Sequence, residues 1–148
     1  MIDFTIIGVM KKKYDIIEHT ADVGIKAYGR DISECFAHAA VGMFDLITER
    51  SCIEEKGAYK IDLSAEDLEQ LLVDFLSELL FLHGSRNLIF GAITVDVDGE
   101  KCALSAIVHG EKLDLSKHKY GMEIKAVTYH MLEIHDCEPF YVNVLFDI

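Results

Sequence analysis

The sequence predicts an α+β fold in which two helices pack on a mostly antiparallel β-sheet, forming a single-domain sandwich. In two segments the apolar residues recur at spacings of three and four, which is typical of amphipathic helices. Several other segments alternate apolar with polar residues, which is typical of half-buried strands. Strands outnumber helices and most connections between them resemble hairpins, which favours two helices packed on a mostly antiparallel sheet.

The amino-terminal part predicts two strands, over residues 14–18 and 23–30. In the second strand Val23, Ile25 and Ala27 alternate with polar or small residues and define one buried face. The short polar segment between the two strands is His19-Thr20-Ala21-Asp22.

Two helices are expected. The first runs from Ser33, as the N-cap, to about Ile47. The second begins at residues 64–67, Ser-Ala-Glu-Asp, a variant capping box, and ends near His83-Gly84 because glycine terminates helices readily. Its wide apolar stripe favours a central helix lying across the sheet, although a groove for a partner is the alternative.

The remaining strands alternate in the same way and are expected at residues 59–63, 89–97, 102–108, 122–134 and 141–146. Asp98-Gly99, between two alternating segments, is a strong signal for a hairpin turn. Residues 110–121 form a polar, lysine-rich connection, and Pro139 interrupts the chain before the last strand.

Composition limits the classes of protein to consider. The length of 148 residues predicts a single domain. Because 51% of the residues are hydrophobic, the composition excludes the class of disordered proteins. We expect residues 1–12 to be an appendage and residues 13–148 to form the domain. The apolar start of the chain is too short to span a membrane. The four cysteines are too widely spaced for a zinc site and predict reduced, mostly buried thiols in a cytoplasmic protein.

The net charge of −12, from 26 acidic and 14 basic side chains, disfavours direct nucleic-acid binding. Such a surface suits a basic protein partner, or serves solubility alone. Catalytic motifs are missing from the sequence: there is no His-Glu-x-x-His pair, no Gly-x-Ser-x-Gly nucleophile elbow and no phosphate-binding loop. An enzyme is therefore poorly supported.

The two ends of the domain carry the strongest chemical candidates. Asp147 lies beside the terminal carboxylate of Ile148, and Asp22 ends the polar segment after the first strand. If the ends meet, three carboxyl groups share a small volume and require a neutralising cation, for which Ca²⁺ or Mg²⁺ is suited. The alternative for the segment around Asp22 is an ordinary Asx or ST turn. Likewise, residues 125–130, Lys-Ala-Val-Thr-Tyr-His, are either functional or the solvent face of a strand.

Taken together, these segments resemble the archease family. The resemblance covers roughly residues 13–148, and residues 1–12 match nothing in the family pattern. One departure is Met131, which stands where the family often has a small residue such as glycine. The segments that carry the resemblance are residues 14–24 with Gly29, 34–40, 124–130 and the ending 144–148.

The resemblance implies an α+β sandwich and a non-enzymatic protein that activates the GTP-dependent RNA ligase of tRNA splicing, promoting its guanylylation and multiple turnover. The alternative it implies is a chaperone for a tRNA cytosine methyltransferase. By position, it implies a metal site for Ca²⁺ or Mg²⁺ at Asp22, Asp147 and the carboxylate of Ile148. It also implies a partner-activating role for Lys125 and supporting roles for His19 and Thr20. A stand-alone metal-dependent hydrolase remains a third alternative.

Overall fold

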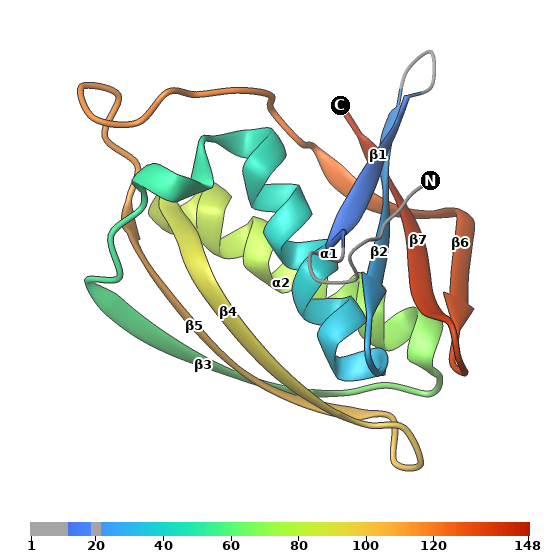
Figure 1. Cartoon of the computed structure of the whole chain (residues 1–148). Helices are drawn as coiled ribbons and strands as arrows, with labels where there is room; N and C mark the ends of the chain where they lie inside the picture. Colours follow the sequence, from blue (N-terminus) through green and yellow to red (C-terminus); the bar gives the residue numbers. More distant parts are fainter. Residues whose placement is uncertain (1–11, 19–21) are drawn as a thin grey trace.

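The computed structural model describes residues 12–18 and 22–148, and shows two helices packed with two antiparallel sheets (Figure 1). The elements in chain order are β1 (Tyr14–Glu18), β2 (Asp22–Gly29), α1 (Ile32–Ile47), the short 3₁₀ helix η1 (Arg50–Cys52), β3 (Gly57–Ser64), α2 (Leu68–Arg86), β4 (Leu88–Asp98), β5 (Ala103–Lys112), β6 (Ala126–His135) and β7 (Phe140–Asp147). The predicted α+β class is confirmed.

The strands form two separate sheets instead of the single sheet that was expected. One sheet has four strands in the order β1-β2-β7-β6, and the other has three in the order β3-β5-β4. Every strand pair is antiparallel. The last strand therefore pairs with one of the first, and the two ends of the domain meet along the β2–β7 ladder.

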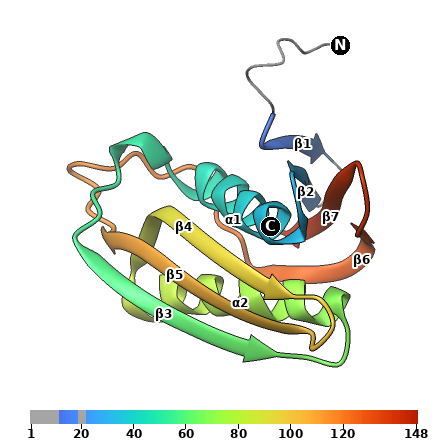
Figure 2. The same ribbon diagram turned by 60° about the horizontal axis from the view of Figure 1, so that its bottom comes forward.

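The helices lie between the two sheets, and each contacts strands of both (Figure 2). α1 packs against β2, β7 and β4, whereas α2 packs against β6 and all three strands of the smaller sheet. Phe36 and Phe44 of α1 and Phe75 of α2 are fully buried at the centre of the core. Burying aromatic side chains of this size contributes about 2–3 kcal/mol each through the hydrophobic effect.

Both helix starts differ from the sequence prediction. Asp31, rather than Ser33, caps α1 by accepting the Glu34 N–H at 2.8 Å. Ser64 ends β3, and Asp67 caps α2 by accepting the Gln70 N–H at 2.8 Å. Aspartate and serine are about equally good N-caps, and the Ser33 hydroxyl instead accepts the Val97 N–H at 2.8 Å. The two aspartates also interact favourably with the positive end of the helix dipole.

The end of α2 and the hairpin turn show where the backbone takes unusual conformations. α2 continues past His83-Gly84 to Arg86, and Asn87 ends it in the left-handed conformation with φ 59°. The predicted turn at Asp98-Gly99 is confirmed, because β4 ends at Asp98 and β5 begins at Ala103. Cys102, the last residue of the connection, has a left-handed φ of 49°. Asparagine is among the few residues that adopt this conformation at low cost.

The thiols are less buried than the sequence suggested. Of the four cysteines, all without a disulfide, only Cys35 is fully buried, and Cys52 and Cys137 are exposed. Burial raises the pKa of the Cys35 thiol to about 12, with Asp31, Glu34 and Asp136 adding to the effect. None of the helices in the described residues is long and apolar enough to span a membrane.

Candidate functional site

Two carboxylates face each other at the edge of the four-stranded sheet where the chain ends. Asp22, the first residue of β2, lies directly opposite Asp147, the last residue of β7. Directly opposite residues in an antiparallel pair have Cβ atoms about 4.5–5.5 Å apart on the same face. The two side chains therefore share one small volume, as the sequence predicted if the ends of the domain met.

The pleat of the sheet places this pair on the face away from α1. Val23 and Ile25 of β2, and Phe146 of β7, alternate with the aspartates and are buried in the core. Because successive side chains of a strand point to opposite faces, Asp22 and Asp147 point outward. On the next strand Ala126 lies opposite Asp147, so its small side chain shares the face of the carboxylates. We call Asp22, Asp147 and the terminal Ile148 the acidic corner.

Lys125 adjoins the acidic corner through its backbone. Its N–H donates to the Asp147 carbonyl at 2.7 Å. Its neighbour Ala126 shares the outer face with Asp147, so the pleat directs Lys125 the other way, and Lys125 lines a pocket of about 460 Å³ beside the end of α2. The pocket also has Leu80, His83, Tyr120 and Glu123 in its wall. The lysine and the acidic corner are therefore neighbouring features on two sides of one strand end.

The acidic corner fits the chemistry of a hard divalent cation only if a third donor joins it. Carboxylate oxygens are the ligands that Ca²⁺ and Mg²⁺ prefer. Among the side chains of residues 12–18 and 22–148, no three His, Cys, Asp or Glu residues come close enough to hold a metal ion. Asp22 and Asp147 would need a third ligand, either the carboxylate of Ile148, a residue that is 38% exposed, or a donor from a partner. His19 and Thr20, expected to support the site, lie outside the described residues.

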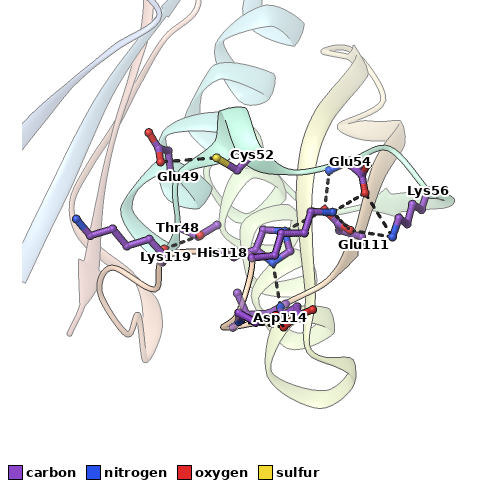
Figure 3. Close-up of polar contacts among 12 residues, drawn as sticks. Thr48, Glu49, Cys52, Glu54, Lys56, Glu111, Asp114, His118 and Lys119 are labelled. Carbon is purple, nitrogen blue, oxygen red and sulfur yellow. Dashed lines mark hydrogen bonds and ion pairs between the residues drawn. The ribbon is translucent and has the colours of Figure 1, made fainter.

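The connection that leads from β5 to Lys125 is anchored by the buried polar side chains of the described chain, Thr48, Glu111 and His118 (Figure 3). The Thr48 hydroxyl donates to the Lys119 carbonyl at 2.7 Å. His118 Nδ1 accepts the Asp114 N–H at 2.9 Å, so its Nε2 carries the hydrogen that is donated to Glu111 Oε2 at 2.9 Å. These bonds hold a stretch that has no regular secondary structure in a fixed position.

Glu111 is the centre of this anchor. Besides His118, it accepts the Glu54 N–H at 2.7 Å and two contacts from Lys117 at 2.9 and 3.0 Å. Burial alone would raise the pKa of Glu111, but the Glu54 N–H, Lys117 and His118 outweigh it and lower the pKa to about 2. The sequence suggested only a polar connection here, and no periodicity or motif marked Glu111 or His118 as buried.

An exposed apolar segment lies farther along the same strand as Ala126. The β6–β7 pairing is irregular between Thr128 and Glu133. Within that irregularity Tyr129 is 57% exposed and Met131 is 60% exposed, and Met131 has a left-handed φ of 56°. Glycine adopts this conformation freely whereas other residues do so at a cost, which explains why a small residue suits this position.

The fold and the site define a class of small α+β protein in which two carboxylates pair at one edge of a four-stranded antiparallel sheet. The archease protein family model (MTH1598/TM1083) matches residues 14–148 of the chain. The chain belongs to the archease family.

Individual relatives agree with this assignment. The chain is 41% identical over 125 residues to protein archease of Pyrococcus furiosus, covering 83% of this chain and 88% of the relative. It is 36% identical over 131 residues to protein archease of Sulfurisphaera tokodaii, covering 88% and 94% of the two chains. The solution structure of Methanobacterium thermoautotrophicum protein 1598 superposes with a TM-score of 0.80 at 34% identity, covering 92% of this chain and 99% of that one.

Proposed function

We propose that this protein activates the GTP-dependent RNA ligase of tRNA splicing as a non-enzymatic cofactor, promoting guanylylation and multiple turnover through the acidic corner. The observation that carries the proposal is the register of Asp22 opposite Asp147 on the outer face, with the end of the chain beside them. Membership of the archease family supports it, because the family resemblance implies this activity for the same residues.

In this proposal the acidic corner holds a divalent cation, Ca²⁺ or Mg²⁺, with Asp22, Asp147 and the Ile148 carboxylate as ligands. Such a cation neutralises charge that develops on phosphate oxygens during nucleotidyl transfer. Lys125 acts from the adjoining pocket on the partner. The net charge of −12 would steer the protein toward a basic, RNA-binding ligase and away from free RNA.

Ligase reconstitution tests the proposal. The double variant Asp22→Asn/Asp147→Asn should abolish stimulation of guanylylation and of repeated turnover, because it removes both side-chain carboxylates while keeping their shape. The matched control is Asp62→Asn/Asp96→Asn, which makes the same charge change at exposed positions on the smaller sheet. If the acidic-corner variant still stimulated the ligase, the site assignment would be refuted. If the control variant lost as much stimulation, the loss would be due to the change in net charge and not to the acidic corner.

Calorimetric titration with Ca²⁺ and with Mg²⁺ separates metal binding from ligase activation. Wild type should bind a cation that the Asp22→Asn/Asp147→Asn variant does not. Adding a residue after Ile148 moves the terminal carboxylate and should weaken the same binding. Binding that is unchanged by both alterations would place the cation elsewhere.

A chaperone for a tRNA cytosine methyltransferase is the second candidate. The exposed Tyr129 and Met131 on β6 favour it, because accessible apolar side chains are what a chaperone offers to an aggregating protein. It predicts suppression of methyltransferase aggregation that survives loss of the acidic corner and is weakened by Tyr129→Ser/Met131→Ser.

A further inference from the structure

The pocket that Lys125 lines has the size of a nucleoside site. Its volume of about 460 Å³ falls within the range of about 300–1,000 Å³ that is typical of small-molecule sites. Leu80 and Gly84 of α2 form one side, and Leu113 and Lys125 of the connection from β5 to β6 form the other. Asn87 joins the two sides, because its Nδ2 donates to the Leu113 carbonyl at 3.2 Å and its carbonyl accepts the Leu113 N–H at 2.8 Å. The pocket therefore lies between two segments that are bonded to each other.

Two aromatic rings of nearly the same orientation border the pocket. Tyr120 is 39% exposed, and the planes of its ring and of the His83 imidazole lie within 15° of each other, with centroids 6.5 Å apart. The His83 ring is held in this orientation because its Nδ1 donates to the Leu88 carbonyl at 2.9 Å. A planar ligand parallel to these rings would stack on an aromatic face, which is how many proteins hold a nucleobase.

The polar atoms of the pocket are mostly hydrogen-bond acceptors. Since the Leu88 carbonyl can only accept, Nδ1 of His83 carries the hydrogen and its Nε2 is an acceptor. The bond from Asn87 Nδ2 fixes the amide and leaves its Oδ1 as an acceptor. Glu123 adds a carboxylate near Tyr120, because partial burial and the charge of Glu123 together raise the pKa of Tyr120. A ligand for this pocket must therefore bring several donors.

Lys125 is the exception among these polar groups. With His83 neutral, it is the one cation among the described residues that line the pocket. Lys125 and Glu123 are both exposed on either side of the buried Ile124. Within residues 12–18 and 22–148, neither Glu123 nor Lys125 takes part in an ion pair. Both charged groups are therefore available to a ligand, Glu123 as an acceptor and Lys125 as a donor.

Guanine is the nucleobase whose edges match this arrangement. Its N1–H and N2–H₂ groups are neighbouring donors, which a carboxylate can accept with both oxygens. Its O6 and N7 atoms are acceptors that suit an ammonium group. Adenine, cytosine and uracil do not have two donor nitrogens side by side. An arginine side chain offers similar donors, but the Lys125 ammonium group would repel its charge.

We propose that the pocket at the end of α2 binds the guanine base of a nucleotide. Glu123 accepts from N1–H and N2–H₂, Lys125 donates to O6 or N7, and the base stacks on Tyr120. The net charge of −12 disfavours contacts with phosphate, so recognition depends on the base. The inference deepens the proposed function, and only the carrier of the base rests on it: a guanylylated ligase would bring its guanine to the pocket in which Lys125 lies.

Titration of the isotope-labelled full chain with GMP, IMP and AMP, followed by NMR, tests the proposal. The three nucleotides carry the same phosphate, so a difference between them arises from the base. The amides of Gly84, Tyr120 and Glu123 should shift saturably with GMP. IMP lacks the N2 amino group and should bind at least about fivefold more weakly, and AMP at least about tenfold more weakly.

Two results of this titration would overturn the proposal. Equal binding of GMP and AMP would show a phosphate contact to Lys125 and no recognition of the base. The absence of a saturable shift at the pocket amides with GMP would show that the pocket does not bind the nucleotide.

Variants assign the roles of the side chains. Glu123→Gln should weaken GMP binding at least about tenfold and remove the preference over AMP, because the amide offers one acceptor oxygen instead of two. Tyr120→Leu should weaken the binding of all three nucleotides, because it removes the stacking face and keeps an apolar side chain. The matched control Glu55→Gln makes the same charge change at an exposed residue that does not line the pocket, and should leave binding unchanged. A preference for GMP that persists in Glu123→Gln would contradict the assigned contact.

The acidic-corner variant Asp22→Asn/Asp147→Asn separates this proposal from the proposed function. It should bind GMP as wild type does, because neither aspartate lines the pocket. Failure of wild type to bind GMP would overturn the guanine site and leave ligase activation through the acidic corner intact. Ligase stimulation that survives in the acidic-corner variant would have the opposite meaning. Loss of GMP binding in that variant would show that the nucleotide binds at the acidic corner instead, and would overturn the pocket.

Discussion

Replacing Glu111 by glutamine should destabilise the protein by about 2 kcal/mol near neutral pH. The carboxylate, whose side chain is 6% exposed, accepts from the Glu54 N–H, His118 Nε2 and the Lys117 ammonium group. Glutamine keeps the shape but turns one oxygen into an NH₂ group, so a donor then faces a donor in a buried site. A buried donor left without an acceptor costs about 1–3 kcal/mol.

The pKa of Glu111 gives an independent magnitude. The folded pKa of about 2 lies below the ordinary value of 4.5, a difference that corresponds to about 3 kcal/mol at 1.36 kcal/mol per unit. Lys117 is 35% exposed, so solvent screens its share and reduces the expected contribution to about 2 kcal/mol. The cost expected from a buried donor without an acceptor and the contribution expected from the lowered pKa are therefore of the same size.

Urea unfolding of wild type and of Glu111→Gln as a function of pH measures this contribution. Between about pH 4.5 and pH 2 the unfolded chain binds the proton at Glu111 more readily than the folded chain, so stability rises with pH there. The difference in the free energy of unfolding between wild type and Glu111→Gln should be largest above about pH 4.5 and should shrink as the pH falls toward 2. The control Glu55→Gln makes the same change at an exposed position and should cost less than about 0.5 kcal/mol. An advantage that does not change over that range would refute the role assigned to the carboxylate.

Two further predictions concern the backbone. Met131→Gly should stabilise the protein by about 0.5–1 kcal/mol, because glycine removes the cost of the left-handed φ of 56° at an exposed side chain; an unchanged or lower melting temperature would contradict this. Gly110→Ala should cost about 3 kcal/mol or more in urea unfolding, because a Cβ at Gly110 would lie 1.8 Å from the Ile89 carbonyl oxygen and force β4 away from β5. A cost under about 1 kcal/mol would show that the two strands can separate locally.

The sequence by itself determined most elements and the segments that carry chemistry. The alternation of Val23, Ile25 and Ala27 marked β2, and the spacing in α1 marked its buried face, because local periodicity matches the geometry of each element. The helix caps were placed wrongly by a few residues. Ser33 and Ser64 are sound caps by type, but which oxygen reaches the first free N–H groups depends on the path of the preceding loop.

Only the tertiary structure decided how distant segments pair. The division into two sheets, the register of Asp22 against Asp147 and the turn of Lys125 toward α2 arise from contacts across the whole chain, and local patterns do not encode them. Burial of Glu111 beside His118 is of the same kind. A charged residue is placed in the interior only where donors from elsewhere in the chain converge on it, and that convergence exists only once the chain has folded.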